Sequence, residues 1–275
     1  GYVVGFAGNE IIQSEPYLPY AFPLKNRHSI EYDIVAMASV GDMIVIATKG
    51  KPYALLGSSP DASQVRDIDL VEPCVSARSM VDMGKFAIYA SRNGLVAVGS
   101  NGAELITTSI LDRNSWSQFE PETIHAYLYE NKYIGISETG GFIYDPEKGD
   151  LSRLDETFDC CYHHLETGDL YTCSGGDIRL FDKGLTNKEL TWKSKQFLMP
   201  DSNYYSWCWI ETSDITKVGI SIWFNDELLV SIAKGELIDT RFRLPLLRGQ
   251  LLQFELKSDV KIKRVTFGRS AAELR

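Results

Sequence analysis

The chain has 275 residues, 44% of them hydrophobic and 24% charged, which is typical of a soluble globular protein. Its formal charge of −9 argues against a surface that binds nucleic acid by neutralising phosphates. We expect no membrane span, because no uninterrupted apolar run reaches the length of a membrane helix. The five cysteines, an odd number in a large chain, do not indicate a disulfide framework and favour synthesis in a reducing cytosol.

A β-hairpin is predicted at residues 3–14, because two apolar runs flank the turn Gly8-Asn9. A loop rich in proline and aromatic residues follows at residues 15–23, where three prolines exclude a helix or a central strand. We expect this loop to pack over the edge of a sheet. The alternative is a binding surface whose candidate residues are Tyr17, Tyr20 and Phe22.

A pattern of two apolar runs joined by a glycine turn recurs between residues 33 and 182. The turn glycines are at positions 50, 94, 140 and 176, so the spacing is 36 to 46 residues. A repeat of this length with four strands per unit is typical of β-propeller blades. The predicted strands of the four units are 34–40, 43–48, 53–57 and 65–70; 79–82, 86–91, 95–99 and 104–107; 124–129, 133–137, 142–145 and 151–154; and 159–165, 170–173, 178–181 and 189–192.

The only predicted helix is 112–119, with Asp112 as its N-cap. After residue 198 the pattern changes to six strands that alternate apolar and polar residues. They are predicted at 206–211, 217–224, 228–233, 240–244, 251–256 and 260–267. The sequence therefore predicts an all-β protein: β-propeller blades at 1–198, which need not close within this chain, and a small antiparallel β-sandwich or jelly roll at 199–275. The tail at 270–275 is predicted to cap the sheet as a short helical turn.

One cluster has the residue types of a metal site. If Leu165 faces Asp169 in a hairpin, Cys161 pairs with Cys173 and His163 lies on the same face. Two thiolates and an imidazole could hold zinc, but no fourth ligand is evident. We therefore prefer the interpretation that these residues are packed in a blade, and we expect no cofactor.

Catalytic chemistry has little support in the sequence. Several carboxylates lie close together in sequence, as a propeller glycoside hydrolase would require, but acidic residues at turns are usually solvated. These carboxylates are Asp67 and Asp69, Asp145 and Glu147, and Asp155 and Glu156. No nucleophile elbow, phosphate-binding loop or zinc-protease motif occurs, so we expect no enzyme.

Three tryptophans offer another platform for a sugar or a receptor: Trp207, Trp209 and Trp223. Trp207 and Trp209 are two residues apart on one predicted strand and so share a face. Such a pair more often belongs to the core of a sandwich than to a sugar site, and this is the interpretation we prefer.

Several stretches resemble the tail nozzle, or tail tubular protein B, family of bacteriophage and prophage virions. They are residues 9–23, 44–53, 72–82, 88–95, 242–245 and 265–274, with phrases such as Glu72-Pro-Cys-Val-Ser-Ala-Arg-Ser-Met and Val265-Thr-Phe-Gly-Arg-Ser. The resemblance implies a non-enzymatic structural protein, made in the bacterial cytoplasm and located in the virion. It also implies a ring-forming homo-oligomer, commonly a hexamer, that contacts other tail or head–tail connector proteins. Genomic DNA would pass through this ring without specific binding during ejection. The alternatives are a carbohydrate- or receptor-binding module of a phage tail and a propeller glycoside hydrolase.

Overall fold

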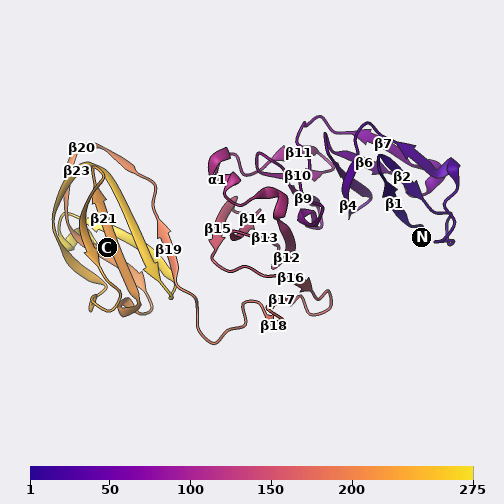
Figure 1. Ribbon diagram of the computed structural model, residues 1–275. Coiled ribbons are helices and arrows are strands. Elements are labelled where there is room, and N and C mark those ends of the chain that lie inside the picture. The colour runs from indigo at the N-terminus through magenta and orange to yellow at the C-terminus, as the bar shows by residue number, and fades with distance from the viewer. Residues whose placement is uncertain (275) are drawn as a thin grey trace. The chain divides into compact units, whose positions relative to one another are not determined.

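The computed structural model describes residues 1–274, apart from the side chains of 200–204 and 246–248. The chain is all-β and consists of antiparallel sheets, most of them with three or four strands (Figure 1). It divides into two compact units, residues 1–182 (unit 1) and residues 183–275 (unit 2). The predicted all-β class is therefore confirmed at this level.

Unit 1 contains five antiparallel sheets that follow one another along the chain. The first sheet comprises β1 (Val4–Ala7), β2 (Glu10–Gln13) and β3 (Arg27–Ser29). The second comprises β4 (Ile34–Val40), β5 (Met43–Thr48), β6 (Tyr53–Leu56) and β7 (Gln64–Asp67), and the third comprises β8 (Val81–Asp82), β9 (Phe86–Ala90), β10 (Leu95–Gly99) and β11 (Gly102–Leu105). The fourth comprises β12 (His125–Tyr129), β13 (Lys132–Ser137), β14 (Gly140–Asp145) and β15 (Asp150–Leu154), and the fifth comprises β16 (Cys160–His163), β17 (Leu170–Ser174) and β18 (Asp177–Leu180).

Short helices interrupt the sheets. Helix α1 (Arg113–Ser117) begins as predicted at the N-cap Asp112, whose carboxylate accepts a hydrogen bond from the Ser115 amide. The 3-10 turns are η1 (Leu24–Asn26), η2 (Pro60–Ala62), η3 (Ala77–Ser79), η4 (Pro121–Thr123), η5 (Ile215–Lys217) and η6 (Ala271–Glu273). Turn η6 provides the predicted cap: Leu274, which follows it, is fully buried beside Gly268.

Consecutive sheets of unit 1 meet mainly through their first strands. Strand β4 lies next to β1 and β8, and β12 lies next to β8 and β16. Apolar clusters fill the spaces between neighbouring sheets, for example Tyr89 with Val45 between the second and third sheets and Tyr133 with Ile88 between the third and fourth. A sheet in the middle of this series is therefore buried on both faces.

A hydroxyl residue closes the glycine turn in three of these sheets. Thr48, Ser91 and Ser137 are buried at the end of the second strand of their sheets (β5, β9 and β13), and each donates a hydrogen bond to a carbonyl three residues later. Gly50 has no room for a side chain, because a Cβ there would lie 2.5 Å from the ring of Tyr32. The repeated turns are thus held both by side-chain hydrogen bonds and by close packing.

Unit 2 contains two long strands, and each of them pairs with different neighbours along its length. These are β20 (Phe197–Thr212) and β23 (Arg241–Ser258), and the remaining strands are β19 (Leu190–Lys193), β21 (Val218–Phe224), β22 (Glu227–Ile232) and β24 (Ile262–Gly268). Strands β21 and β19 pair with the C-terminal part of β23, whereas β20 pairs with its N-terminal part and with β24. One apolar core that includes Cys208, Ile220 and Phe254 joins these two groups of strands.

Two predictions about these elements were wrong. Residues 189–192 were expected to complete the fourth propeller unit, but β19 pairs with residues 255–258 of β23 in unit 2. The units consequently separate after Asp182 and not at 198, and the fifth sheet has three strands. The predicted strands 240–244 and 251–256 are parts of a single strand, β23. The first error concerns pairing between residues that are far apart in sequence, and the second concerns the continuity of one strand.

Candidate binding surfaces

The charge of the chain is divided unequally between the two units. Residues 1–182 contain 26 Asp and Glu against 13 Lys and Arg, and residues 183–275 contain 11 Asp and Glu against 15 Lys and Arg. The formal charge of −9 is therefore −13 on unit 1 and +4 on unit 2. The negative charge of unit 1 disfavours binding to a polyanion, whereas the positive charge of unit 2 does not.

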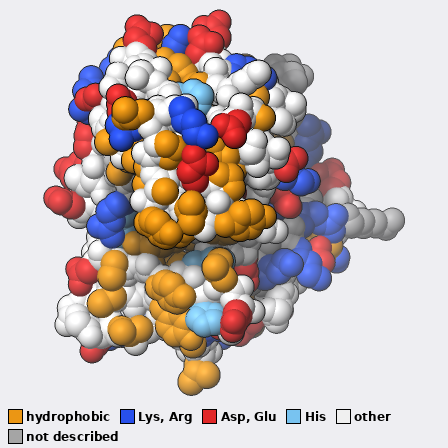
Figure 2. All heavy atoms as spheres, turned by 90° about the vertical axis from the view of Figure 1, so that its right-hand side faces the viewer, with side chains coloured by type: hydrophobic (Ala, Val, Ile, Leu, Met, Phe, Trp, Pro, Cys, Tyr) orange, Lys and Arg blue, Asp and Glu red, His pale blue; other side chains and the backbone are white. Residues whose placement is uncertain are grey.

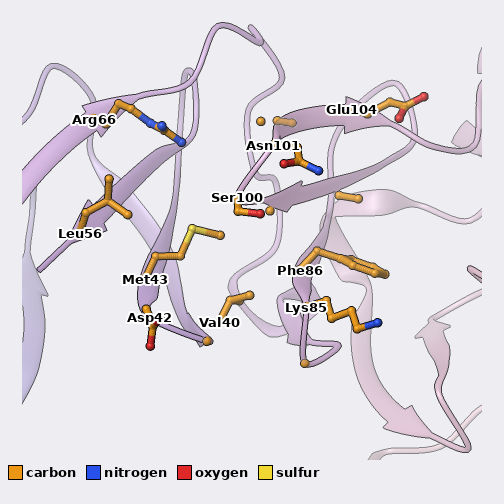
Figure 3. A pocket seen from close by; sticks show the side chains of 16 residues that line it. Val40, Asp42, Met43, Leu56, Arg66, Lys85, Phe86, Ser100, Asn101 and Glu104 are labelled. Atoms are coloured by element: carbon orange, nitrogen blue, oxygen red, sulfur yellow. The ribbon is translucent and has the colours of Figure 1, made fainter. Parts of the chain in front are cut away.

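A cleft with a volume of about 930 Å³ lies between the second and third sheets of unit 1 (Figure 3). Met43 and Leu56 line it from the second sheet, and Phe86 lines it from the third. Charged residues stand on both sides: Asp42 and Arg66 on the second sheet, and Lys85 and Glu104 on the third. Arg66 and Met43 point into the space between the sheets, whereas Phe86, Lys85 and Glu104 point away from the second sheet (Figure 3). The cleft thus combines an apolar side chain with a cation, which can accept an amphipathic ligand.

Sequence reasoning did not identify this cleft. The signal is the small size of the residues that the third sheet contributes to it, Ala97, Gly99 and Ala103. At Gly99 a Cβ would come within 3.3 Å of the Phe86 side chain. Small residues in an otherwise large apolar pattern therefore keep the space between the sheets open.

Two aromatic side chains of the proline- and aromatic-rich loop are exposed, and the expectation that the loop packs over a sheet edge stays a prediction. Tyr17 is 84% exposed and Tyr20 is 79% exposed, while Phe22 is half-buried. Backbone hydrogen bonds hold the loop, among them Tyr17 N–H to the Gly1 carbonyl and Ala21 N–H to the Leu18 carbonyl. The side of unit 1 on which the N-terminus lies shows exposed hydrophobic side chains among charged ones (Figure 2).

The conformation of Tyr17 also distinguishes this loop. Its φ of 64° is in the left-handed region, which is uncommon for a large side chain. Together with the hydrogen bonds, this conformation presents two tyrosine rings to the solvent from an ordered loop. The alternative prediction, a binding surface at Tyr17 and Tyr20, thus has a suitable geometry.

The predicted metal cluster is not assembled, because the register of its hairpin differs by one residue. Cys160, and not Cys161, pairs with Cys173, and His163 pairs with Leu170. A slip of one residue moves a side chain to the opposite face of a sheet, so Cys173 lies on the other face from Cys161 and His163. No group of three or more potential metal ligands occurs among the described residues.

The two faces of the fifth sheet have different environments. The inner face packs against the fourth sheet through Leu170, Cys161 and the following Phe181. The outer face consists of two rows of three cross-strand neighbours: Cys160, Cys173 and Ile178, and Tyr162, Tyr171 and Leu180. Tyr162 is 62% exposed and Ile178 is 73% exposed. An apolar sheet face with this exposure is characteristic of an interaction surface.

On unit 2, Trp207 and Trp209 share a face as predicted, but it is not the core face. The residues that alternate with them, Cys208 and Ile210, are fully buried in the core, and the two tryptophans are half-buried on the other side. The guanidinium groups of Arg241 and Arg264 lie 4.8 and 4.4 Å from the centroid of the Trp209 ring.

Trp223 does not join this pair. Its partner on β23 is Gln253, whereas the partner of Trp207 on the same strand is Arg243, ten residues away. The Lys193 ammonium lies 4.2 Å from the centroid of the Trp223 ring. The three tryptophans are therefore parts of two separate aromatic and basic surfaces and do not form one platform.

Two of the carboxylates that were considered for glycoside hydrolysis, Asp67 and Asp145, have local partners. Asp67 forms an ion pair with Lys51 at 2.8 Å, and this hydrogen bond lowers the pKa of Asp67. Burial of Asp145 would raise its pKa, but hydrogen bonds from the amides of Lys148 and Glu147 outweigh it and the pKa is lowered. These contacts give the two carboxylates roles in an ion pair and a turn.

Comparisons with known proteins add no family assignment. No protein-family model matches the chain, and no curated protein matches it. PorZ, a surface component of the type-IX secretion system of Porphyromonas gingivalis, overlaps 56% of this chain and 21% of its own length, with 10% identity and a TM-score of 0.42. The extracellular domain of BT4673 from B. thetaiotaomicron overlaps 66% of this chain and 25% of its own length, with 15% identity and a TM-score of 0.44.

The WD40 domain of SCAP from fission yeast overlaps 94% of this chain and 82% of its own length, with 8% identity and a TM-score of 0.36. The chain thus spans about a fifth to a quarter of PorZ and BT4673. Within residues 1–274, no helix has the length and apolar character needed to cross a membrane. At these levels of similarity, function has to be argued from the residues of this chain.

Proposed function

We propose that the chain is a non-enzymatic structural subunit of a bacteriophage tail, similar to the tail nozzle proteins. In this proposal the sheets of unit 1 are blades of a β-propeller that does not close within this chain, and unit 2 is a β-sandwich. The contacts between the first strands of consecutive sheets support the propeller, because blades arranged around an axis meet at their innermost strands.

The single observation that carries the assembly is the outer face of the fifth sheet. The second, third and fourth sheets have four strands each, but the fifth has three, and four of the six side chains on its outer face are exposed while Tyr171 and Cys173 are half-buried. Burying such a face against a second copy would remove apolar area from water, at roughly 25 cal/mol per Å². A ring of subunits closed through this face would enclose a passage.

The charge of unit 1 is suited to such a passage. Duplex DNA carries one negative charge per roughly 1.7 Å, and basic contacts would hold it by releasing counterions. A unit with a formal charge of −13 would let DNA pass without specific binding. The other partners in this proposal are tail or head–tail connector proteins, and the location is the virion.

The assembly is tested by light scattering after size exclusion and by electron microscopy of the purified protein. We expect ring-shaped oligomers, which Tyr162→Glu and Leu180→Glu should convert to monomers. Leu165→Glu is the matched control, since Leu165 is 86% exposed in the loop of the same hairpin but is not on the outer face of the sheet. Monomers of the unchanged chain at all concentrations would contradict the proposal.

The loop at residues 15–23 supports a second candidate function, a carbohydrate- or receptor-binding module of a tail. The observation in its favour is the high exposure of Tyr17 and Tyr20 on a hydrogen-bonded loop. A glycan array tests it: the double variant Tyr17→Ala and Tyr20→Ala should lose binding, and Leu24→Ala, which changes a residue that is 78% exposed, should retain it. An unchanged chain without any glycan signal would remove the carbohydrate version of this candidate.

A further inference from the structure

Two cysteines face each other across neighbouring strands of the fifth sheet. Cys160 on β16 is directly opposite Cys173 on β17. Cys160 is exposed and Cys173 is half-buried, and both are free thiols. The corrected register, which separates Cys173 from Cys161 and His163, is also what brings these two thiols together.

Their opposed positions bring the two Cα atoms into the range that a disulfide requires. Directly opposed residues of antiparallel strands have Cα atoms about 4.5 or 5.5 Å apart, depending on the hydrogen-bond pattern. A disulfide requires about 4.4 to 6.8 Å between its Cα atoms. The two side chains lie on the same face of the sheet, because directly opposed residues of neighbouring strands share a face. A bond between the two sulfurs therefore needs no change in the strand pairing.

The other three cysteines lack these properties. Cys74 is 3% exposed and Cys208 is fully buried, and burial raises the pKa of these thiols to about 11 and about 12. Cys161 is adjacent to Cys160 in sequence but faces the fourth sheet, and burial raises the pKa of its thiol to about 12. Thiols of this kind react slowly, because the thiolate is the reactive form.

The two opposed thiols differ in accessibility. Burial and the neighbouring Cys160 both raise the pKa of the Cys173 thiol. Cys160 is the exposed member of the pair in the single subunit, so it can be reached from solvent whenever the outer face is not covered by a second copy. This difference assigns Cys160 as the attacking thiol and Cys173 as the resolving thiol.

We propose that Cys160 and Cys173 are a reversible redox pair that forms a cross-strand disulfide by exchange with a low-molecular-weight disulfide. The Cys160 thiolate attacks one sulfur of the small disulfide, forms a mixed disulfide and releases one small thiolate. The Cys173 thiolate then attacks the Cys160 sulfur, forms the protein disulfide and releases the second small thiolate. The protein loses two protons and two electrons, and one small disulfide is reduced to two small thiols.

The bond would act on the open end of unit 1. It would join β16 to β17 and close the loop of the hairpin between them, in a sheet that lacks the fourth strand of its neighbours. In a reducing compartment the pair is a dithiol and the hairpin is held by its backbone pairing. In oxidising surroundings the hairpin that carries the outer face of the fifth sheet is cross-linked.

The experiment uses the whole chain and oxidised glutathione as the disulfide. The protein is equilibrated with oxidised glutathione, quenched in acid, alkylated with iodoacetamide and mapped by mass spectrometry. We expect loss of alkylation at Cys160 and Cys173, a cross-linked peptide that joins them, and full recovery of both thiols after reduction. Cys161→Ser should leave this result unchanged, and Cys160→Ser should abolish it.

Amide hydrogen exchange of the unchanged chain gives a readout that does not depend on any variant. Exchange in β16 and β17 should slow on oxidation, while exchange in the fourth sheet stays the same. A Cys160–Cys161 bond, a stable glutathione adduct at Cys160 without the cross-link, or two fully alkylated thiols after treatment would each overturn the proposal.

Discussion

The fourth and fifth sheets of unit 1 follow the same sequence pattern but differ in burial and completeness. In the fourth sheet, Tyr133 and Phe142 are fully buried, and β15 pairs with the edge of β14. In the fifth sheet, β18 is exposed along its whole length and pairs only with β17. An edge strand such as β18 is buried only when another element packs against it. The same local sequence pattern therefore forms part of the core in the fourth sheet and an exposed surface in the fifth.

The difference also concerns the turns and the thiols. The hydroxyl of Ser137 closes the turn of the fourth sheet, whereas in the fifth sheet the Asp159 carboxylate accepts a hydrogen bond from the Gly175 amide. The outer face of the fifth sheet contains the Cys160–Cys173 pair. Stability in the fifth sheet therefore depends less on the apolar core than in the fourth sheet, and more on additional partners or bonds.

A pair of alanine substitutions tests the difference in burial between the fourth and fifth sheets, and one of them should have the largest effect of all. Trp116 is fully buried against Phe142 and donates its indole N–H to the Ser91 carbonyl at 2.9 Å. We expect Trp116→Ala to lower the free energy of unfolding by about 3 to 5 kcal/mol, because it creates a cavity and leaves a carbonyl unpaired. Ile178→Ala, at a residue that is 73% exposed in the fifth sheet, should cost less than about 0.5 kcal/mol. Urea unfolding followed by circular dichroism measures both, and equal losses would show that the fifth sheet is as buried as the fourth.

The disulfide would reduce the contrast between the two sheets. A disulfide between Cys160 and Cys173 would close the loop of this hairpin. For a loop of about 15 residues, which is close to this length, the expected stabilisation is about 3 kcal/mol. We expect this increase in the free energy of local unfolding of the hairpin when oxidised and reduced protein are compared by hydrogen exchange. Cys173→Ser should show no difference between the two conditions, and a difference that persists in this variant would assign the effect to another thiol.

The strands of unit 1 could be predicted from the sequence because their signals are local. Alternation of apolar residues and a turn glycine are both contained within one hairpin, as in β5 and β6. The pairing of β19 was missed because its partner on β23 is more than 60 residues away. Residues 190–193 have the composition of a strand in either unit, so only tertiary contacts decide where they pair.

The candidate sites depended on the strand register and on which face of a sheet is buried, and an alternating sequence pattern determines neither. The hairpin loop between β16 and β17 has four residues, since the His164 amide donates to the Asp169 carbonyl, and this length sets the register that moves Cys173 away from Cys161. Alternation showed that Trp207 and Trp209 share a face, but not which face is buried. The recurring hydroxyl before each turn glycine was present in the sequence and could have identified the turn-closing residues.

These turn hydroxyls give the next prediction. Ser91 is fully buried; its hydroxyl donates to the Gly94 carbonyl at 3.0 Å and accepts from the Asn93 amide at 3.2 Å. We expect Ser91→Ala to lower the free energy of unfolding by about 1 kcal/mol, since the Asn93 amide loses its partner and the Gly94 carbonyl keeps only the Ser91 amide as a donor. Ser174→Ala is the matched change at the exposed turn of the fifth sheet and should stay within about 0.5 kcal/mol of the unchanged chain. Thermal unfolding of the two variants tests this, and a larger loss at Ser174 would place a closing hydrogen bond there too.

The smallest expected effect is a dependence of stability on pH at the boundary between the fourth and fifth sheets. Burial lowers the pKa of His125 on β12 below 6.5, and the nearby Arg78 lowers it further, although the backbone of Phe158 and the Asp159 carboxylate act in the opposite direction. His125 also contacts the Tyr127 hydroxyl at 3.2 Å. The imidazole of His125 therefore takes up a proton at higher pH in the unfolded chain than in the folded chain. The contribution of neutral His125 to stability is fully present above about pH 6.5 and is lost as the pH falls toward the pKa of the folded chain. Unfolding midpoints measured between pH 7 and pH 5 should fall less steeply in His125→Gln than in the unchanged chain, because the glutamine cannot take up this proton; parallel slopes would show that other groups account for the acid sensitivity of this boundary.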